Sequence, residues 1–113
     1  MTDVLILTWT DVCALDDLVV GRGVAALVGG EQVAVFRWDD ETVYAVSNLD
    51  PFSGAYVISR GIVGSRGETP KVASPMYKQN FDLRTGACLD DPQECLASYA
   101  VRVVGGRVEV GSP

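Results

Sequence analysis

The chain has 113 residues, of which 48% are apolar and 21% charged, so it suits one domain with a single core. Its net charge of −6 argues against nucleic-acid binding, because phosphate contacts require a large basic surface. It has no run of about 18 apolar residues and no basic N-terminal start, so we expect neither a membrane span nor a signal peptide. These features predict one cytoplasmic domain over residues 1–113, with residues 1–8 loosely ordered.

The first half of the chain predicts a succession of short β-strands. The expected strands cover residues 5–13, 24–28, 32–38 and 42–47. Trp9 and Val12 are expected to face inward from the first of them. Gly29 and Gly30 predict a two-residue hairpin turn, because both central positions of such a turn take positive φ. Short strands joined by turns at this spacing favour a small antiparallel sandwich or barrel.

The second half continues the strand pattern around one irregular segment. Residues 59–70 contain three glycines and a proline, and we expect them to form a surface loop. The remaining expected strands cover residues 71–74, 81–83, 99–104 and 107–110, the last two joined by a glycine pair. Helical periodicity is weak throughout, so the chain is expected to be all-β.

The residue types present exclude several kinds of catalytic site. The sequence contains no histidine, which rules out Ser/His/Asp and Cys/His arrangements. Its three cysteines, at positions 13, 88 and 95, are odd in number and lack the C-x-x-C spacing of zinc or redox sites. No glycine-rich nucleotide-binding motif is present either. We therefore expect reduced thiols, no metal site and no catalytic activity of the isolated chain.

Two stretches carry the most specific pattern in the sequence. The first reads D-P-F-S-G-A over residues 50–55, and the second reads S-P-M-Y over residues 74–77, followed by F-D-L-R-T-G over residues 81–86. They resemble the C-P-H-x-G-A and C-P-W-H loops of Rieske iron–sulfur proteins. The resemblance implies a Rieske-like fold, a small antiparallel β-sandwich or barrel with two loops at one tip.

The residues that would bind a Rieske cluster are replaced in this chain. Asp50 and Ser74 stand at the cysteine positions, and Phe52 and Tyr77 stand at the histidine positions. A Rieske centre needs two thiolates on one iron and two imidazoles on the other. Phenylalanine has no donor atom, while serine and tyrosine are weak ligands at neutral pH. We therefore expect no cofactor and no metal on this chain.

A closer resemblance covers the chain from about residue 12 to residue 110. The two loops, the S-R-G-I-V-G segment between them and the following C-L-D-D are similar to the small subunits of assimilatory NAD(P)H-dependent nitrite reductases. This implies a subunit of an enzyme that reduces nitrite to ammonium, bound to a large subunit. The large subunit is then expected to carry siroheme, an iron–sulfur cluster, FAD and the NAD(P)H site, with no electrons passing through this chain.

The replaced loop residues also suggest where such a partner binds. Residues 59–84 have a local charge of +3, while the rest of the chain has −9. We expect the partner interface to include Phe52, Met76, Tyr77, Lys78, Arg60 and Arg66. Two alternatives remain open: the loop side chains fill the volume that a cluster would occupy, and the basic residues are scattered solvated charges.

Two other classes of function are compatible with the same residues. The chain is alternatively a Rieske-like regulatory or ligand-binding module of another oxidoreductase, with a small molecule in the space left by the cluster. The second alternative is an electron carrier with an unusual metal site, in which case the purified protein would be coloured.

Overall fold

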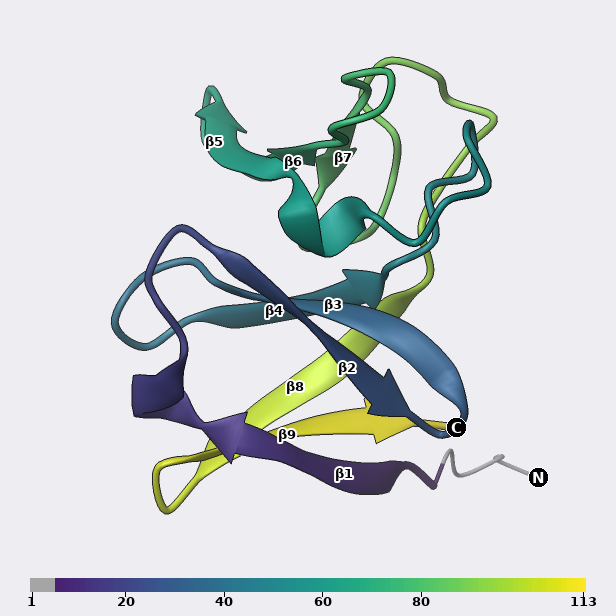
Figure 1. Cartoon of the computed structure of the whole chain (residues 1–113). Coiled ribbons are helices and arrows are strands. Elements are labelled where there is room, and N and C mark those ends of the chain that lie inside the picture. Colours follow the sequence, from purple (N-terminus) through teal and green to yellow (C-terminus); the bar gives the residue numbers. More distant parts are fainter. Residues whose placement is uncertain (1–5) are drawn as a thin grey trace, which may run out of the picture.

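The computed structural model describes residues 6–113, which form short antiparallel strands and two single-turn 3-10 helices (Figure 1). The strands are β1 (Thr8–Ala14), β2 (Gly23–Val28), β3 (Glu31–Arg37), β4 (Val43–Ser47), β5 (Ile62–Arg66), β6 (Thr69–Ala73), β7 (Asn80–Asp82), β8 (Ser98–Val104) and β9 (Arg107–Ser112). The helices are η1 (Leu15–Asp17) and η2 (Ile58–Arg60). Residues 1–5 lie outside the described part of the chain. They include Leu5, expected to begin the first strand, and most of residues 1–8, expected to be loosely ordered.

The strands form two sheets of unequal size. Six strands make a barrel-like sheet in the order β1-β9-β8-β4-β3-β2, and β5, β6 and β7 make a small sheet. Figure 1 shows the small sheet above the barrel, and η2 packs against β2 and β3. The predicted all-β architecture is therefore confirmed. No helix among residues 6–113 is long and apolar enough to cross a membrane.

Glycine pairs form both of the predicted tight hairpins. Gly29 and Gly30, between β2 and β3, have φ of 57° and 84°. Gly105 and Gly106, between β8 and β9, have φ of 57° and 76°. Positive φ at both central positions gives the turn a twist that matches the flanking strands, which is why glycine is favoured there.

Strand β3 is buried on both faces and connects two hydrophobic cores. Val33 and Val35 point into the barrel, where they pack with residues of β2, β4 and β9. Ala34 and Phe36 point to the opposite face and pack with residues of η2, β6 and β7. All four side chains have 0% exposure, which explains a continuous apolar run in place of simple alternation.

The expectation of a surface loop over residues 59–70 is wrong. The segment contains η2, all of β5 and the start of β6, and the β5–β6 hairpin turns at Gly67, where φ is 61°. Arg66 pairs with Thr69, so Ser65 and Pro70 form a pair without ladder hydrogen bonds. Proline is tolerated there because its missing N–H points away from β5. Glycine and proline therefore lie within a hairpin here, although the sequence indicated a loop.

The inward orientation expected for the first strand is correct at only one position. Val12 packs against the barrel core. Trp9 belongs to neither core; its ring lies 4.1 Å from the guanidinium carbon of Arg102 on β8. Residues three apart on a regular strand face opposite sides, so Trp9 and Val12 do not share a face, and Val12 itself lies in the β-bulge between Asp11 and Cys13.

Candidate functional site

The small sheet of β5, β6 and β7, together with η2 and the loops around them, is called the lobe here. Two loops with Rieske-like sequences lie on this lobe, above the barrel in Figure 1. Loop 1, residues 50–55, leads from β4 towards η2, and loop 2, residues 74–79, joins β6 to β7. In loop 1 the N–H of Asp50 donates to the C=O of Ala55, and the N–H of Gly54 donates to the C=O of Asp50, both at 2.8 Å. Each end of the loop is therefore held by the other through backbone hydrogen bonds.

Loop 2 repeats this backbone pattern residue for residue. The N–H of Ser74 donates to the C=O of Gln79 at 2.9 Å, and the N–H of Lys78 donates to the C=O of Ser74 at 3.0 Å. Lys78 has φ of 63°, at the position where loop 1 has Gly54 with φ of 74°. Among residues 6–113, Lys78 is the one non-glycine residue with positive φ. A left-handed backbone costs a side-chain-bearing residue about 1–2 kcal/mol, so loop 2 is strained at this lysine.

The residues at the two cysteine positions fasten the loops together. The Ser74 hydroxyl donates to Oδ2 of Asp50 at 2.5 Å. The other carboxylate oxygen accepts the N–H groups of Phe52 at 2.8 Å and Ser53 at 3.4 Å, and Oγ of Ser74 accepts the N–H of Met76 at 3.3 Å. Asp50 and Ser74 are 0% and 1% exposed. Because a buried carboxylate without donors is costly, this set of hydrogen bonds explains how Asp50 is accommodated.

Asn48 anchors loop 1 to the barrel from below. Its side-chain amide donates to Oε1 of Gln32 and to the C=O of Tyr56, both at 3.3 Å. Its side-chain oxygen accepts the N–H of Ser59 at 2.7 Å. Asn48 is 1% exposed, so these bonds satisfy a buried amide and hold both ends of the loop in place.

The apolar and aromatic loop residues have two different environments. Phe52 is half-buried, and its ring centroid lies 6.2 Å from that of Phe81 in the lobe core. Met76 and Tyr77 are 49% and 60% exposed. Phe52 therefore occupies interior volume, as one of the two alternatives expected, whereas Met76 and Tyr77 present apolar surface to solvent.

The side chains at the cluster positions do not fit a two-iron cluster. They supply one carboxylate, one hydroxyl, one phenol and one phenyl ring, from Asp50, Ser74, Tyr77 and Phe52. A Rieske cluster needs two thiolates and two imidazoles, and Asp50 is already saturated by internal donors. No group of three or more His, Cys, Asp or Glu among residues 6–113 is arranged to hold a metal ion.

The cysteines lie in separate parts of the molecule. Cys88 is buried in the lobe core, Cys95 is exposed, and Cys13 is half-buried on β1. Burial, helped by the negative charge of Asp17, raises the pKa of the Cys13 thiol. A raised pKa lowers the fraction of thiolate, so Cys13 is a poor nucleophile and a poor metal ligand at neutral pH.

The fold and the sequence both match known proteins. The Rieske-like [2Fe-2S] domain family matches residues 8–111. A crystal structure of a Mycobacterium tuberculosis protein assigned as an NADH-dependent nitrite reductase small subunit superimposes with a TM-score of 0.93 at 53% identity, covering 96% of this chain and 97% of that one. The NADH nitrite reductase small subunit of Salmonella typhimurium is 45% identical over 90% of this chain and 95% of its own length. The chain belongs to the nitrite reductase small subunits.

The same domain also occurs inside a longer chain. A segment of the NAD(P)H nitrite reductase large subunit of Klebsiella oxytoca is 41% identical over 92% of this small subunit. The match covers 11% of the Klebsiella chain. In that organism the Rieske-like domain is therefore covalently part of a large subunit.

Several basic residues of the small subunit are engaged within the lobe. Nη2 of Arg66 lies 3.1 Å from Oδ1 of Asp90, and the other oxygen of that carboxylate accepts the backbone and side-chain N–H groups of Asn80. Lys71 donates to the side-chain oxygen of Asn80 at 2.6 Å. These contacts join β5, β6 and β7 to the segment after β7, so Arg66 has a structural partner as well as an exposed surface.

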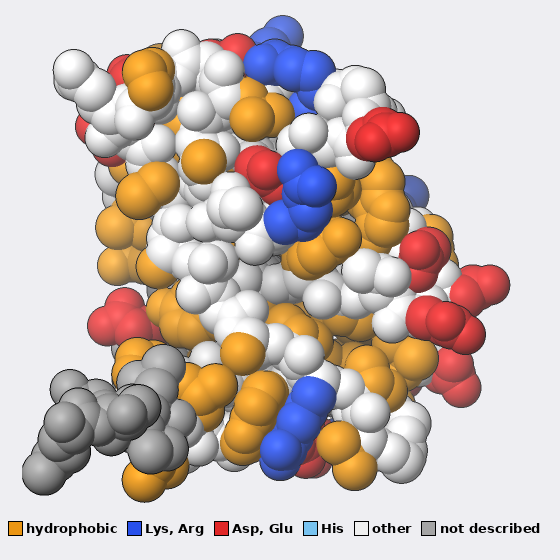
Figure 2. Space-filling model, turned by 180° about the vertical axis from the view of Figure 1, so that it is seen from behind, with side chains coloured by type: hydrophobic (Ala, Val, Ile, Leu, Met, Phe, Trp, Pro, Cys, Tyr) orange, Lys and Arg blue, Asp and Glu red, His pale blue; other side chains and the backbone are white. Residues whose placement is uncertain are grey.

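The remaining basic residues of this region differ in their partners. Arg84 pairs with Asp82 at 3.2 Å. No hydrogen bond or ion pair between described residues involves the exposed side chain of Arg60 or Lys78. Figure 2 shows Lys and Arg side chains on the upper part of the molecule with Asp and Glu side chains among them, a further group of Asp and Glu side chains at the right edge of the barrel, and a basic side chain near the bottom. Asp90, Asp91 and Glu94 follow the basic segment along the chain but lie in the same lobe, so the positive balance of residues 59–84 is not a separate positive region in space.

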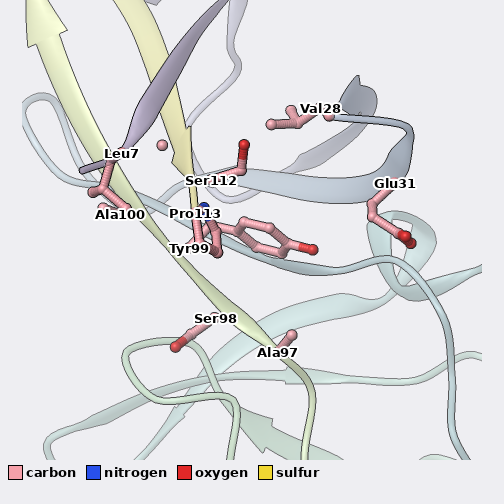
Figure 3. A pocket seen from close by; sticks show the side chains of 11 residues that line it. Leu7, Val28, Glu31, Ala97, Ser98, Tyr99, Ala100, Ser112 and Pro113 are labelled. Atoms are coloured by element: carbon pink, nitrogen blue, oxygen red, sulfur yellow. The ribbon is translucent and has the colours of Figure 1, made fainter. Parts of the chain in front are cut away.

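An apolar hollow of about 570 Å³ lies between the β2–β3 hairpin, the start of β8 and the end of β9. Figure 3 shows the ring of Tyr99 in this hollow, between Ser112 and Glu31. None of the residues at the four cluster positions lines it. The hollow therefore gives no support to a ligand site in the space left by the cluster.

Sequence reasoning missed two exposed side chains at the foot of loop 1. Leu49 and Tyr56 face each other as an isolated β-bridge and are 37% and 52% exposed. The sequence contained no signal for this, and Leu49 lies between two buried residues, Asn48 and Asp50. It also missed Lys78 at the left-handed position, although the alignment of the two loop sequences places Lys78 opposite Gly54.

Proposed function

We propose that this small subunit is a non-catalytic component of an NAD(P)H-dependent nitrite reductase. It binds the large subunit and supports the reduction of nitrite to ammonium in nitrogen assimilation, in the cytoplasm. The observation that carries the proposal is the Klebsiella oxytoca large subunit, in which a domain 41% identical to this chain is part of the partner itself. A domain that works when covalently joined to a large subunit is expected to bind one when separate.

The chemistry of the reaction belongs to the partner in this proposal. Reduction of nitrite to ammonium takes six electrons and requires redox cofactors. We infer that the large subunit carries siroheme, an iron–sulfur cluster, FAD and the NAD(P)H site. The small subunit contributes no electron carrier, because its cluster positions hold Asp50, Phe52, Ser74 and Tyr77.

We infer that the tip of the lobe forms the interface with the large subunit. Its centre is the tip surface, defined here as Met76, Tyr77 and Lys78, which is exposed and combines apolar contact area with a positive charge. Aromatic and Met side chains are enriched in interface cores. We include Phe52, which is half-buried against Phe81, in this interface, and Arg60 and Arg66 add outer charges. The strain at Lys78 favours a functional role, because strained backbone persists mainly at such sites.

The test of the function is nitrite-dependent oxidation of NAD(P)H by the large subunit, with and without an equal concentration of this chain. We expect co-elution of the two chains, together with higher activity or a longer lifetime of activity. Absence of both effects would remove the proposal.

The test of the interface is a double substitution, Met76→Asp with Tyr77→Asp, which places two charges on the tip surface. Because central interface residues each contribute more than 1 kcal/mol, binding should weaken by at least about tenfold. Val104→Asp, at a 53% exposed position in the β8–β9 hairpin, is the matched control and should leave binding unchanged. Equal binding by the double variant would place the interface elsewhere.

A further inference from the structure

Strand β2 is an edge strand of the barrel sheet with a free row of backbone groups. It pairs with β3 on one side only. The two-residue turn makes Val28 and Glu31 a hydrogen-bonded pair, so the N–H and C=O groups of Gly23, Ala25 and Leu27 point away from β3. Among residues 6–113, no backbone bond outside the β2–β3 pair engages Ala25 or Leu27. These groups are available to another strand.

The side chains of β2 leave this edge without the usual protection. The strand reads G-V-A-A-L-V and has no charged residue, no proline and no bulge. Leu27 is 70% exposed and Val24 is 39% exposed. Natural edge strands are normally blocked by lysine, proline or a bulge, because an open apolar edge pairs with other chains. The other edge of the same sheet, β1, carries a bulge and Asp11.

A groove runs along the free edge of β2. It has a volume of about 400 Å³ and lies between β2, β1 and η1. Leu18 is 3% exposed and contributes to the apolar floor, together with Val12. Two carboxylates, Asp11 and Asp17, line the groove. Asp11 is paired with Arg107, whereas Asp17 forms no ion pair with any residue in the described part of the chain.

We propose that the free edge of β2 binds an extended segment of the nitrite reductase large subunit by strand addition. This inference rests on the proposed function, and it names a second contact, separate from the tip surface. The segment would hydrogen-bond to the N–H and C=O groups of Ala25 and Leu27. It would place apolar side chains against Leu27 and Val24, and a Lys or Arg beside Asp17.

The charge of the groove favours a basic segment of a different chain over a second copy of this one. Two small subunits joined through β2 would bring together two acidic grooves on chains of net charge −6. Like charges opposed across an interface are destabilising, whereas a basic strand is attracted to Asp17. Main-chain bonding to an exposed edge, with alternate side chains in a groove, is a common mode of peptide recognition.

The first experiment is amide hydrogen exchange of the wild-type small subunit, alone and bound to the large subunit. Ala25 and Leu27 amides should exchange rapidly in the free chain and become at least about tenfold slower in the complex. Val24 and Ala26 amides already bond to β3 and should change less. A complex that forms while Ala25 and Leu27 remain unprotected overturns the strand-addition proposal and leaves the proposed function standing.

The second experiment uses proline to remove an edge donor without breaking the sheet. Ala25→Pro removes an N–H that points away from β3, and it should weaken binding to the large subunit by about tenfold or more. Ser65→Pro is the matched control, because Ser65 also has an outward N–H, on the edge strand β5. Equal affinity of both variants and the wild type contradicts the proposal.

Two further outcomes also decide the matter. If the wild-type chain does not bind the large subunit at all, both the proposed function and this inference fail. If the isolated chain forms a dimer in which the Ala25 and Leu27 amides are protected, the edge binds a second copy, and the assignment to the large subunit is overturned.

Discussion

The hydroxyl of Ser74 and the carboxylate of Asp50 form a 2.5 Å hydrogen bond in the interior of the tip, between two loops that are otherwise held by separate backbone bonds. In a Rieske protein these two positions hold cysteines that bind one iron of the cluster. In this small subunit a side-chain hydrogen bond joins the same two positions. The loops are therefore fastened to each other without a cofactor.

Removing this hydrogen bond should destabilise the protein. Ser74→Ala leaves Oδ2 of Asp50 buried without its donor, which costs about 1–3 kcal/mol. Chemical denaturation of the two proteins measures the loss of unfolding free energy directly. Ser65→Ala, at an exposed position, is the control and should change stability by less than about 0.5 kcal/mol. A Ser74→Ala variant as stable as the control would show that the loops do not depend on this bond.

Phe52 and Tyr77 occupy equivalent positions of the two loops but should differ in their effect on stability. Phe52→Ala removes a half-buried ring that packs against Phe81, and it should cost about 1–3 kcal/mol. Tyr77→Ala alters a side chain that is 60% exposed and should cost less than about 0.5 kcal/mol. Thermal unfolding distinguishes the two. Equal losses would mean that both rings fill interior volume.

The left-handed conformation of Lys78 predicts an unusual preference for glycine. Lys78→Ala keeps the strain, whereas Lys78→Gly relieves it, so the glycine variant should be the more stable of the two by about 1 kcal/mol. Urea denaturation of both variants measures the difference. At Lys71, in a regular strand, the order should be reversed, because glycine weakens a strand interior. An alanine variant at position 78 that is the more stable one would contradict a positive φ in solution.

Gly86 is required by sterics as well as by φ. Its φ is 83°, and a Cβ at this position would collide with the carbonyl oxygen of Leu96. The N–H of Leu96 also donates to the C=O of Gly86 at 2.7 Å, so the two segments cannot separate without losing this bond. Gly86→Ala should cost more than about 3 kcal/mol. Gly67→Ala, with φ of 61° and open space around it, should cost only about 1–2 kcal/mol.

Two carboxylates in the lobe should make stability depend on acid pH. Hydrogen bonds from the backbone and side chain of Asn80, helped by Arg66, lower the pKa of Asp90. Burial opposes the effect at Asp82, but the hydrogen bonds and charge of Arg84 still lower the pKa of that carboxyl. A pKa lower in the folded state than in the unfolded one stabilises the fold above about pH 4, and this contribution is lost as the pH falls through the folded-state value.

Thermal unfolding from pH 8 to pH 3 measures this dependence. The Tm should be nearly constant between pH 8 and pH 6, because the chain has no histidine, and should fall towards pH 3. Asp90→Asn should lower the Tm at pH 7, and its difference from wild type should shrink as the pH falls. A difference of constant size would contradict the assigned role of the Asp90 charge.

The sequence was sufficient to predict the all-β fold, the two hairpins with glycine pairs and the replaced cluster positions. These features depend on local chemistry: positive φ favours glycine, and a missing imidazole or thiolate is visible in the residue type itself. The same local chemistry misled the prediction for residues 59–70. Gly64, Gly67 and Pro70 are loop-forming residues, yet β5 and β6 pair as a hairpin here, and β7 pairs with the other side of β6.

Tertiary structure alone established which loop residues lie inside and which outside. Asp50 and Ser74 are 24 positions apart, so nothing along the chain shows that they share a hydrogen bond. Phe52 is half-buried because Phe81 comes to lie beneath it, and β2 is an edge because β1 pairs with β9. Burial and strand order depend on contacts between distant segments, and these form only when the two sheets pack on β3.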